Sequence, residues 1–359
     1  MTAALGLAAR ELGNVWPNPA VGCILVKAGR VIGRGWTQPG GRPHAEAEAL
    51  RRAGEGARGA VAYITLEPCA HHGETPPCAH ALAEAGIARA VIALQDPDPR
   101  VDGGGVRVLS DAGIDVATGV CAAEAEELNA GFIMRVTRGR PLVTLKCATT
   151  LDGRIATHGG MSRWITSEAA RARAHNLRAC HDAVMVGIGT ALADDPELTC
   201  RLPGLEQRSP VRLVVDSRLR LALTSKLVQS ADKVPTWVIT LAGPDRERRR
   251  ACVDCGLDVI GVDADRDGNL DLSAALQALG GRGLTRVLVE GGGRLAAGLL
   301  RAGVVDRLAW FRAPAVIGGD GVPVAAAFGI DELAQAPAFR RLSVAEIGDD
   351  LLETYAVAS

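Results

Sequence analysis

The sequence predicts an α/β protein made of two unlike domains, and three observations support this prediction. The chain has 359 residues, about twice the size of a typical domain. Short Val-rich apolar runs alternate with Ala- and Leu-rich segments, a pattern typical of buried sheets covered by helices. After Ala122–Arg138 the residues Gly139, Arg140 and Pro141 interrupt the alternation. We therefore expect one domain in residues 1–139 and a second in residues 140–359.

In the first half, apolar runs of strand length are separated by segments with helical periodicity. The N-terminal segment MTAALGLAARELG also has the pattern of an amphipathic helix. The expected strands are Ala20–Val26, Val31–Arg34, Val61–Leu66 and Val91–Leu94, and the expected helices are His44–Ala53, Ala79–Ala85 and Ala122–Arg138.

The second half repeats the alternation but shares no motif with the first, so the two domains are not internal repeats. The expected strands are Leu142–Cys147, Ala183–Val186, Val211–Val215, Thr236–Thr240 and Val287–Glu290, and the expected helices are Ser167–Ala179, Ala274–Leu279 and Leu295–Arg301.

Charge and composition exclude several classes of function. The net charge is −1, from 40 basic and 41 acidic residues, and without a long basic run nucleic-acid binding has little support. No apolar run approaches the ~20 residues that span a bilayer, so we expect a cytoplasmic protein. The nine cysteines, without a secretion signal, indicate free thiols or metal ligands. Cys252 and Cys255 form a C-x₂-C pair, but no second pair follows, and we expect structural thiols there.

One histidine and two cysteines form a candidate zinc site. His44 is followed 25 residues later by Cys69, and Cys78 comes nine residues after that. Three protein ligands leave the fourth tetrahedral position of Zn²⁺ for water, as in catalytic sites. Glu46 lies two residues after His44 and could carry a proton without being a ligand.

The pattern departs from the general signature of nucleobase deaminases, H-x-E followed by P-C-x-x-C, because eight residues separate the two cysteines. The insert contains His71 and His72, which could replace a cysteine as ligand or line the pocket. His44 as a simple helix cap beside buried thiols is the alternative, but the combined motif favours metal binding.

Two glycine-rich turns and a lysine in the second half indicate a nucleotide site. Gly291–Gly293 follow an expected strand and precede an expected helix, and Gly187–Gly189 form a second turn after the strand Ala183–Val186. Such turns can present backbone N–H groups to a phosphate, although each could also be a plain tight turn. Lys146, at the end of a strand, is either a catalytic residue or a surface lysine.

The whole chain resembles the bifunctional deaminase–reductase family of the riboflavin pathway. The resemblance is carried by Pro17–Gly22, Gly40–Glu46, Glu67–Cys69 and Pro76–Cys78, and in the second half by the order of the turns and polar loops. It implies a cytidine-deaminase-like three-layer domain followed by a dihydrofolate-reductase-like domain. It also implies one Zn²⁺ per chain, NADPH, a phosphoribosyl-pyrimidine substrate and a homo-oligomer, with a dimer favoured.

The resemblance further implies roles for individual residues. His44, Cys69 and Cys78 would bind zinc, Glu46 would shuttle protons, and Asn18 would contact the pyrimidine. Other family members often carry histidine at the positions of Thr37 and Glu48, so local substrate contacts could differ. Arg218 or Arg220 could bind the 2′-phosphate of NADPH. The implied NADPH residues are Ala148, Trp164, Thr190, Asp194, Ser217, Gly292, Gly293, Arg294, Leu295, Ala296, Ala297 and Gly298, and the implied substrate residues of the reductase are Ser162, Arg178, Leu198, Arg201 and Glu290.

Two interpretations from other classes remain open at this point. One is a nucleic-acid-editing deaminase with a C-terminal targeting domain, and the other is a non-enzymatic nucleotide sensor that keeps a structural zinc. The balanced charge and the long loop between the cysteines argue against the first. Oxidation of NADPH in the presence of substrate would exclude the second.

Overall fold

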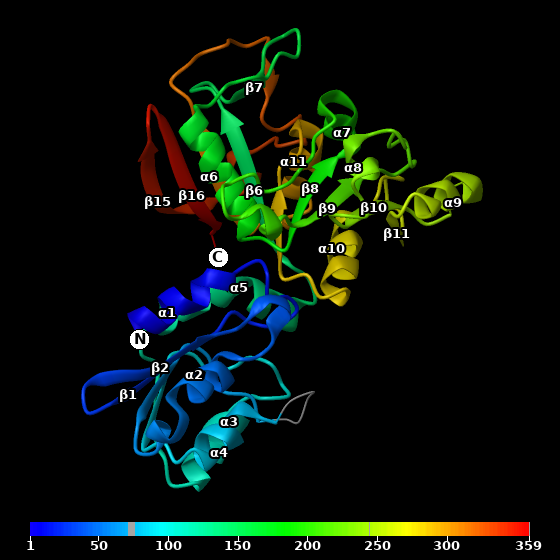
Figure 1. Ribbon diagram of the computed structural model, residues 1–359. Coiled ribbons are helices and arrows are strands. Elements are labelled where there is room, and N and C mark those ends of the chain that lie inside the picture. The colour runs from blue at the N-terminus through cyan, green and yellow to red at the C-terminus, as the bar shows by residue number, and fades with distance from the viewer. Residues whose placement is uncertain (71–75, 244, 359) are drawn as a thin grey trace. The chain divides into compact units, whose positions relative to one another are not determined.

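The computed structural model describes residues 1–70, 76–243 and 245–358. These divide into two compact units, Met1–Gly139 and Arg140–Ser359, which are described separately (Figure 1). His71 and His72 lie outside the described residues. No helix in the described part of the chain is long and apolar enough to cross a membrane.

The first unit is built on a five-stranded sheet with the order β2-β1-β3-β4-β5. Strand β1 is antiparallel to both of its neighbours, whereas β3, β4 and β5 are parallel. The carboxyl ends of the parallel strands therefore lie at one edge of the sheet. The strands are β1 (Gly22–Lys27), β2 (Arg30–Trp36), β3 (Val61–Ile64), β4 (Arg89–Ile92) and β5 (Asp115–Thr118).

Helices cover both faces of this sheet and complete three layers (Figure 1). Ile24 packs against the N-terminal helix, while Cys23 and Leu25, on the other face of β1, pack in the same core as Ala45 and Ala49 of α2. This alternation is expected of a strand buried on both faces. The helices are α1 (Thr2–Ala8), α2 (Ala45–Ala53), α3 (Cys78–Glu84), α4 (Gly104–Asp111) and α5 (Ala122–Arg138).

Two glycines of β2 let α2 lie directly on the sheet. A Cβ atom at Gly35 would lie 1.9 Å from the Ala45 carbonyl oxygen, and one at Gly33 would lie 2.3 Å from the Ala49 carbonyl oxygen. No side chain larger than hydrogen fits at these distances. The contact fixes the N-terminus of α2, which is the end that carries His44 and Glu46.

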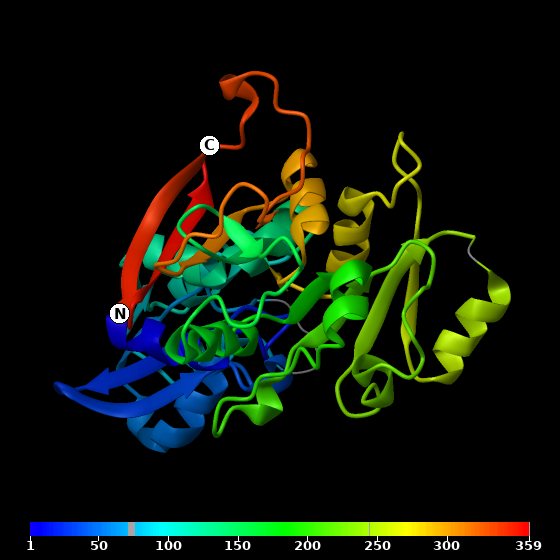
Figure 2. The ribbon, with the colours of Figure 1, turned by 90° about the horizontal axis from the view of Figure 1, so that it is seen from above.

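The second unit contains a nine-stranded sheet with the order β11-β10-β9-β8-β12-β6-β13-β16-β15. The strands from β11 to β13 in this order are parallel, and the hairpin β15–β16 adds an antiparallel edge. In Figure 2 this hairpin and helix α9 lie at opposite ends of the unit. The strands are β6 (Leu142–Thr149), β8 (Ala183–Gly187), β9 (Val211–Val215), β10 (Thr236–Leu241), β11 (Asp258–Val262), β12 (Arg286–Val289), β13 (Arg307–Arg312), β15 (Phe339–Ile347) and β16 (Asp350–Val357).

The helices of this unit connect its parallel strands (Figure 1). A separate two-stranded sheet pairs β7 (Arg154–Ala156) with β14 (Val322–Pro323). The helices are α6 (Glu168–Ala179), α7 (Ile188–Asp194), α8 (Lys226–Gln229), α9 (Arg246–Asp254), α10 (Leu272–Gly281) and α11 (Gly293–Arg301).

Most expected elements are present, but several boundaries in the first unit were wrong. The strand expected from Ala20 begins at Gly22, because the Val21 N–H is bonded to the Thr37 side chain. The helix expected from His44 begins one residue later, with His44 as an extended N-cap. The strands expected to reach Leu66 and Leu94 both end two residues earlier.

A methyl group at Gly35 tests how strongly the contact between β2 and α2 controls the site. Because the added Cβ would overlap the Ala45 carbonyl, we expect Gly35→Ala to destabilise the first unit by about 1–3 kcal/mol. Zinc content should also fall, since His44 would be displaced. Gly56→Ala is the control, because its Cβ would meet only Ile32 at 3.9 Å. Equal zinc content and equal thermal unfolding of the two variants would contradict the prediction.

Candidate active sites

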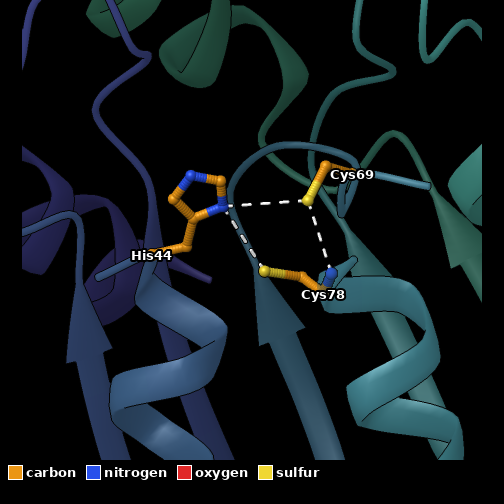
Figure 3. A group of neighbouring side chains, drawn as sticks. All are labelled: His44, Cys69 and Cys78. Atoms are coloured by element: carbon orange, nitrogen blue, oxygen red, sulfur yellow. Dashed lines mark hydrogen bonds between the residues drawn. The ribbon is translucent and has the colours of Figure 1, made fainter. Parts of the chain in front are cut away.

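Three side chains from separate elements converge at the edge of the first sheet. His44 precedes α2, Cys69 lies in the loop after β3, and Cys78 is the first residue of α3 (Figure 3). The Nδ1 atom of His44 lies 3.7 Å from the Cys69 sulfur and 3.4 Å from the Cys78 sulfur. All three donor atoms lie within 4.8 Å of one another.

This donor set fits a tetrahedral zinc ion. With Zn–N near 2.0–2.1 Å and Zn–S near 2.3 Å, a tetrahedral ion separates an imidazole nitrogen from a thiolate sulfur by about 3.6 Å. The two observed separations, 3.7 and 3.4 Å, lie on either side of that value. One imidazole and two thiols form a three-ligand set, which is the kind found in catalytic rather than structural zinc sites.

The two thiols differ in their protonation. A hydrogen bond from Cys78 and another from His44 lower the pKa of Cys69 to about 4, although burial opposes the shift. The hydrogen bond with Cys69, together with burial, raises the pKa of Cys78 well above its usual range. The hydrogen bond between the two sulfurs thus favours a thiolate at Cys69, and binding of a metal by two thiolates releases the protons that the thiols still hold.

Glu46 lies two residues after the ligand candidate His44. Only 4% of it is exposed, and it lies in the first turn of α2. Burial raises the pKa of Glu46 to about 7, while the neighbouring His44 opposes the shift. A carboxyl group with a pKa near neutrality can both accept and release a proton during turnover.

The residues expected near the pyrimidine are held by backbone contacts. Asn18 packs on Gly41, where a Cβ atom would lie 2.0 Å from its amide nitrogen. The Thr37 hydroxyl donates to the Pro19 carbonyl and accepts from the Val21 N–H. Thr37 therefore fixes the segment that follows Asn18. Glu48 instead forms ion pairs with Arg51 and Arg52 on its own helix.

Glu67 is a buried residue of this region to which the sequence assigned no role. Its carboxylate accepts hydrogen bonds from the backbone N–H groups of Asp96, Gly103 and Val106. The motif Glu67-Pro68-Cys69 was visible in the sequence, but its partners lie 29 to 39 residues away. No local pattern could identify them.

The second unit has a cavity of about 1020 Å³ at the carboxyl ends of its parallel strands. Lining residues come from the ends of β6, β8, β9 and β12 and from the N-terminus of α11. Ligands of open α/β sheets bind in this position. The volume is at the top of the range of roughly 300–1,000 Å³ that is usual for ligand and cofactor sites.

Most residues expected to contact the nucleotide line this cavity, and so do two of the expected substrate residues, Ser162 and Glu290. Ala297 is buried and does not line it. Trp164 is 68% exposed and stacks on Arg171, whose guanidinium carbon is 4.4 Å from the ring centre. The expected nucleotide residues along the cavity are Ala148, Trp164, Thr190, Asp194, Ser217, Gly292, Gly293, Arg294, Leu295, Ala296 and Gly298.

A buried ion cluster lies beside the cavity. Arg178 donates two hydrogen bonds to the Glu290 carboxylate, at 2.6 and 3.0 Å, and Lys146 Nζ is 4.0 Å from the same group. Burial alone would raise the pKa of Glu290, but Arg178 and Lys146 lower it to about 2. Glu290 is therefore ionised at neutral pH and keeps both cations beside it.

Three expected substrate residues do not line the cavity. The Arg178 guanidinium donates hydrogen bonds to the Glu290 carboxylate and to the Thr199 carbonyl. Leu198 is 3% exposed with a φ of +55°, and Arg201 forms an ion pair with Glu197. Cys252 and Cys255, at the end of α9, are free thiols, one buried and one exposed, and belong to no metal cluster among the described residues.

Comparison with known proteins identifies the family. The model described as the RibD C-terminal domain matches residues 141–352, and the cytidine and deoxycytidylate deaminase zinc-binding region matches residues 1–94. The chain is 41% identical over 362 aligned residues to the riboflavin biosynthesis protein RibD of Escherichia coli, covering 98% of this chain and 96% of that protein. The chain belongs to the RibD family. It is therefore a bifunctional deaminase and reductase of riboflavin biosynthesis.

Solved RibD structures have the same architecture. Acinetobacter baumannii RibD, form 1, is 38% identical, with a TM-score of 0.90 and coverage of 100% of this chain and 98% of that one. A Thermotoga maritima diaminohydroxyphosphoribosylaminopyrimidine deaminase/5-amino-6-(5-phosphoribosylamino)uracil reductase is 34% identical, with a TM-score of 0.86 and coverage of 100% and 97%. The nucleic-acid-editing and sensor interpretations are therefore wrong.

The cluster of His44, Cys69 and Cys78 predicts that Cys78 is needed for zinc binding. We expect Cys78→Ser to weaken zinc binding by at least about 10-fold, because a hydroxyl is a poorer zinc ligand than a thiolate. Cys255→Ser is the control, since that thiol is exposed and lies outside the cluster. Zinc affinity can be measured by competition with a chromophoric chelator. An unchanged affinity of Cys78→Ser would remove this residue from the ligand set.

Proposed function

We propose that the first unit releases ammonia from 2,5-diamino-6-(5-phosphoribosylamino)pyrimidin-4(3H)-one and that the second unit reduces the deaminated product. In the first reaction water supplies an oxygen to the ring carbon that loses its amino group. In the second, a hydride and a proton convert the ribosyl side chain to ribityl. The observation that carries the proposal is the convergence of His44, Cys69, Cys78 and buried Glu46 in a chain that also has a nucleotide-sized cavity. The Thermotoga maritima relative is described by the same pair of activities.

In the deaminase, His44, Cys69 and Cys78 would hold one zinc ion per chain. The ion would supply Lewis acidity and lower the pKa of water. Glu46 takes a proton from the attacking water and delivers it to the departing ammonia. Its burial and a pKa near 7 suit both steps. Asn18, held on Gly41, donates to or accepts from the pyrimidine edge.

In the reductase, the cavity is proposed to hold NADPH, which supplies the hydride. Gly292 precedes α11 and has no side chain to cap it, so the first amides of the helix are available for a phosphate. A larger residue at Gly292 would crowd Thr190, since its Cβ would lie 3.2 Å from the Thr190 hydroxyl. Arg220 is favoured over Arg218 for the 2′-phosphate, because of these two only Arg220 lines the cavity.

The substrate is proposed to lie beside the ion cluster. Lys146 and Glu290 both line the cavity, and Ser162 lies on its wall. The ammonium of Lys146 can donate to an oxygen or nitrogen of the opened sugar as the hydride arrives. Arg178 holds the carboxylate of Glu290, which leaves that group oriented toward sugar hydroxyls. Leu198 and Arg201 do not line the cavity, and we propose that they contact the substrate from the neighbouring loop.

Removing the carboxylate of Glu46 tests its role in proton transfer. We expect Glu46→Gln to lower ammonia release by about 10²–10⁴-fold, because an amide cannot accept and return the proton. Zinc content and reduction of the deaminated substrate should be unchanged. Glu48→Gln is the matched control on the same helix, since its carboxylate pairs with Arg51. Ammonia release at the wild-type rate by Glu46→Gln would eliminate the assignment.

Replacing Lys146 tests the reductase assignment. We expect Lys146→Met to lower the kcat of NADPH oxidation by about 10²-fold or more, since no ammonium would remain beside Glu290 to donate a proton. Ammonia release should not change. Lys233→Met removes an exposed lysine of the same unit and serves as the control. A kcat within twofold of wild type for Lys146→Met would show that this lysine is only structural.

A further inference from the structure

Glu67 is a buried carboxylate that the proposed reaction does not use. It is 3% exposed and lies two residues before Cys69. One carboxylate oxygen accepts from the Asp96 N–H at 3.2 Å and the Gly103 N–H at 3.1 Å, and the other accepts from the Val106 N–H at 3.0 Å. Three backbone hydrogen bonds to one side chain form a strong anchor.

Two of the three donors, Gly103 and Val106, lie at the start of α4, and the third, Asp96, lies in the segment after β4. Gly103 is the N-cap of that helix and has no side chain to bond its first amides. Glu67 reaches this helix end from the loop after β3 and caps it in place of a local residue. A negative charge at a helix N-terminus is also favoured by the helix dipole. The carboxylate thus joins α4 to the loop that carries Cys69.

The residues on both sides of Cys69 lie against the same helix end. A Cβ atom at Gly105 would lie 2.0 Å from the Pro68 carbonyl oxygen, and one at Gly104 would lie 3.3 Å from Ala70 Cβ. The run of glycines that begins α4 is therefore needed for close contact with this loop. On its other side, Cys69 accepts hydrogen bonds from Cys78 N–H at its sulfur and from Ala79 N–H at its carbonyl.

We propose that Glu67 is a positioning residue of the zinc site, which sets the place of Cys69 by anchoring its loop to α4. The inference rests on the proposed role of Cys69 as a zinc ligand. Glu67 acts through the backbone and not through the substrate. Its loss therefore lowers zinc affinity and the kcat of deamination, while the KM for the pyrimidine and the reductase activity stay unchanged.

The test uses the full-length protein with Glu67→Ala and Glu67→Gln. Zinc affinity is measured by chelator competition, and ammonia release and NADPH oxidation are followed on the same preparations. Glu67→Ala is expected to bind zinc about 10–100-fold more weakly, the usual effect of losing a group that orients a metal ligand. Glu67→Gln should be intermediate, because its amide can accept the bonds from Asp96 and Gly103 but presents N–H to Val106.

A second pair of variants tests the same contact from the helix side. Gly105→Ala should weaken zinc binding without changing Glu67, because its Cβ would overlap the Pro68 carbonyl. Gly6→Ala is the control, since its Cβ would have no neighbour within 4 Å. Wild-type zinc affinity in both Gly105→Ala and Glu67→Gln would overturn the proposal.

The remaining outcomes are also decisive. A raised KM with unchanged zinc affinity would place Glu67 on the substrate side and overturn the proposal. If Glu67→Ala does not fold, Glu67→Gln decides: weaker zinc binding with full reductase activity supports the proposal, and unchanged binding overturns it. Cys69→Ser distinguishes failure of the Glu67 proposal from failure of the ligand assignment on which it rests. Wild-type zinc affinity in this variant would overturn the assignment of Cys69 as a ligand.

Discussion

The carboxyl ends of parallel strands determine where both active sites form. In the first unit β3 ends just before the loop with Cys69, and in the second unit β6, β8, β9 and β12 end at one cavity. Such a strand leads through a turn toward a helix, so polar side chains and helix amides gather at this edge. Apolar clusters fill the space between each sheet and its helices, whereas the reactive groups gather at the strand ends.

Each unit buries a carboxylate near its site but stabilises it differently. Glu67 is surrounded by backbone N–H groups, which hold it without a cation. Glu290 is held by Arg178 and Lys146, and both cations keep it ionised. Backbone donors fix the position of Glu67, and this suits a residue proposed to hold the loop of a metal ligand in place. Charged side-chain donors also create a local field, which suits the reductase role proposed for this site.

The sequence predicted the zinc ligands because their signal is local: a short H-x-E motif and two cysteines nearby. It did not predict α4, β5 or the hairpin β15–β16. Strand β5 has no buried residue, and most residues of β15 are exposed, so neither forms an apolar run. Helix α4 begins with glycines, which weaken a helix prediction. The pair Arg178–Glu290 joins residues 112 positions apart, which no single-sequence pattern can reveal. The two glycine-rich turns indicated a nucleotide site in the second half, but the other residues of the reductase cavity were predictable only through family resemblance, because they come from many separate loops.

The two sides of the deaminase site should tolerate sequence change to different degrees. Thr37 and Glu48 stand where the resemblance predicted histidine in other family members, yet Thr37 bonds the backbone beside Asn18 and Glu48 pairs with arginines on its helix. Another polar side chain could make either contact. The metal side has no such freedom, because helices approach it at Gly35 and Gly105 with no room for a methyl group. A side-chain contact can be replaced by a different side chain, whereas a backbone contact this close requires glycine. In this chain a change at Gly35 or Gly105 is therefore expected to displace the zinc ligands, whereas a polar replacement of Thr37 or Glu48 is expected to leave them in place.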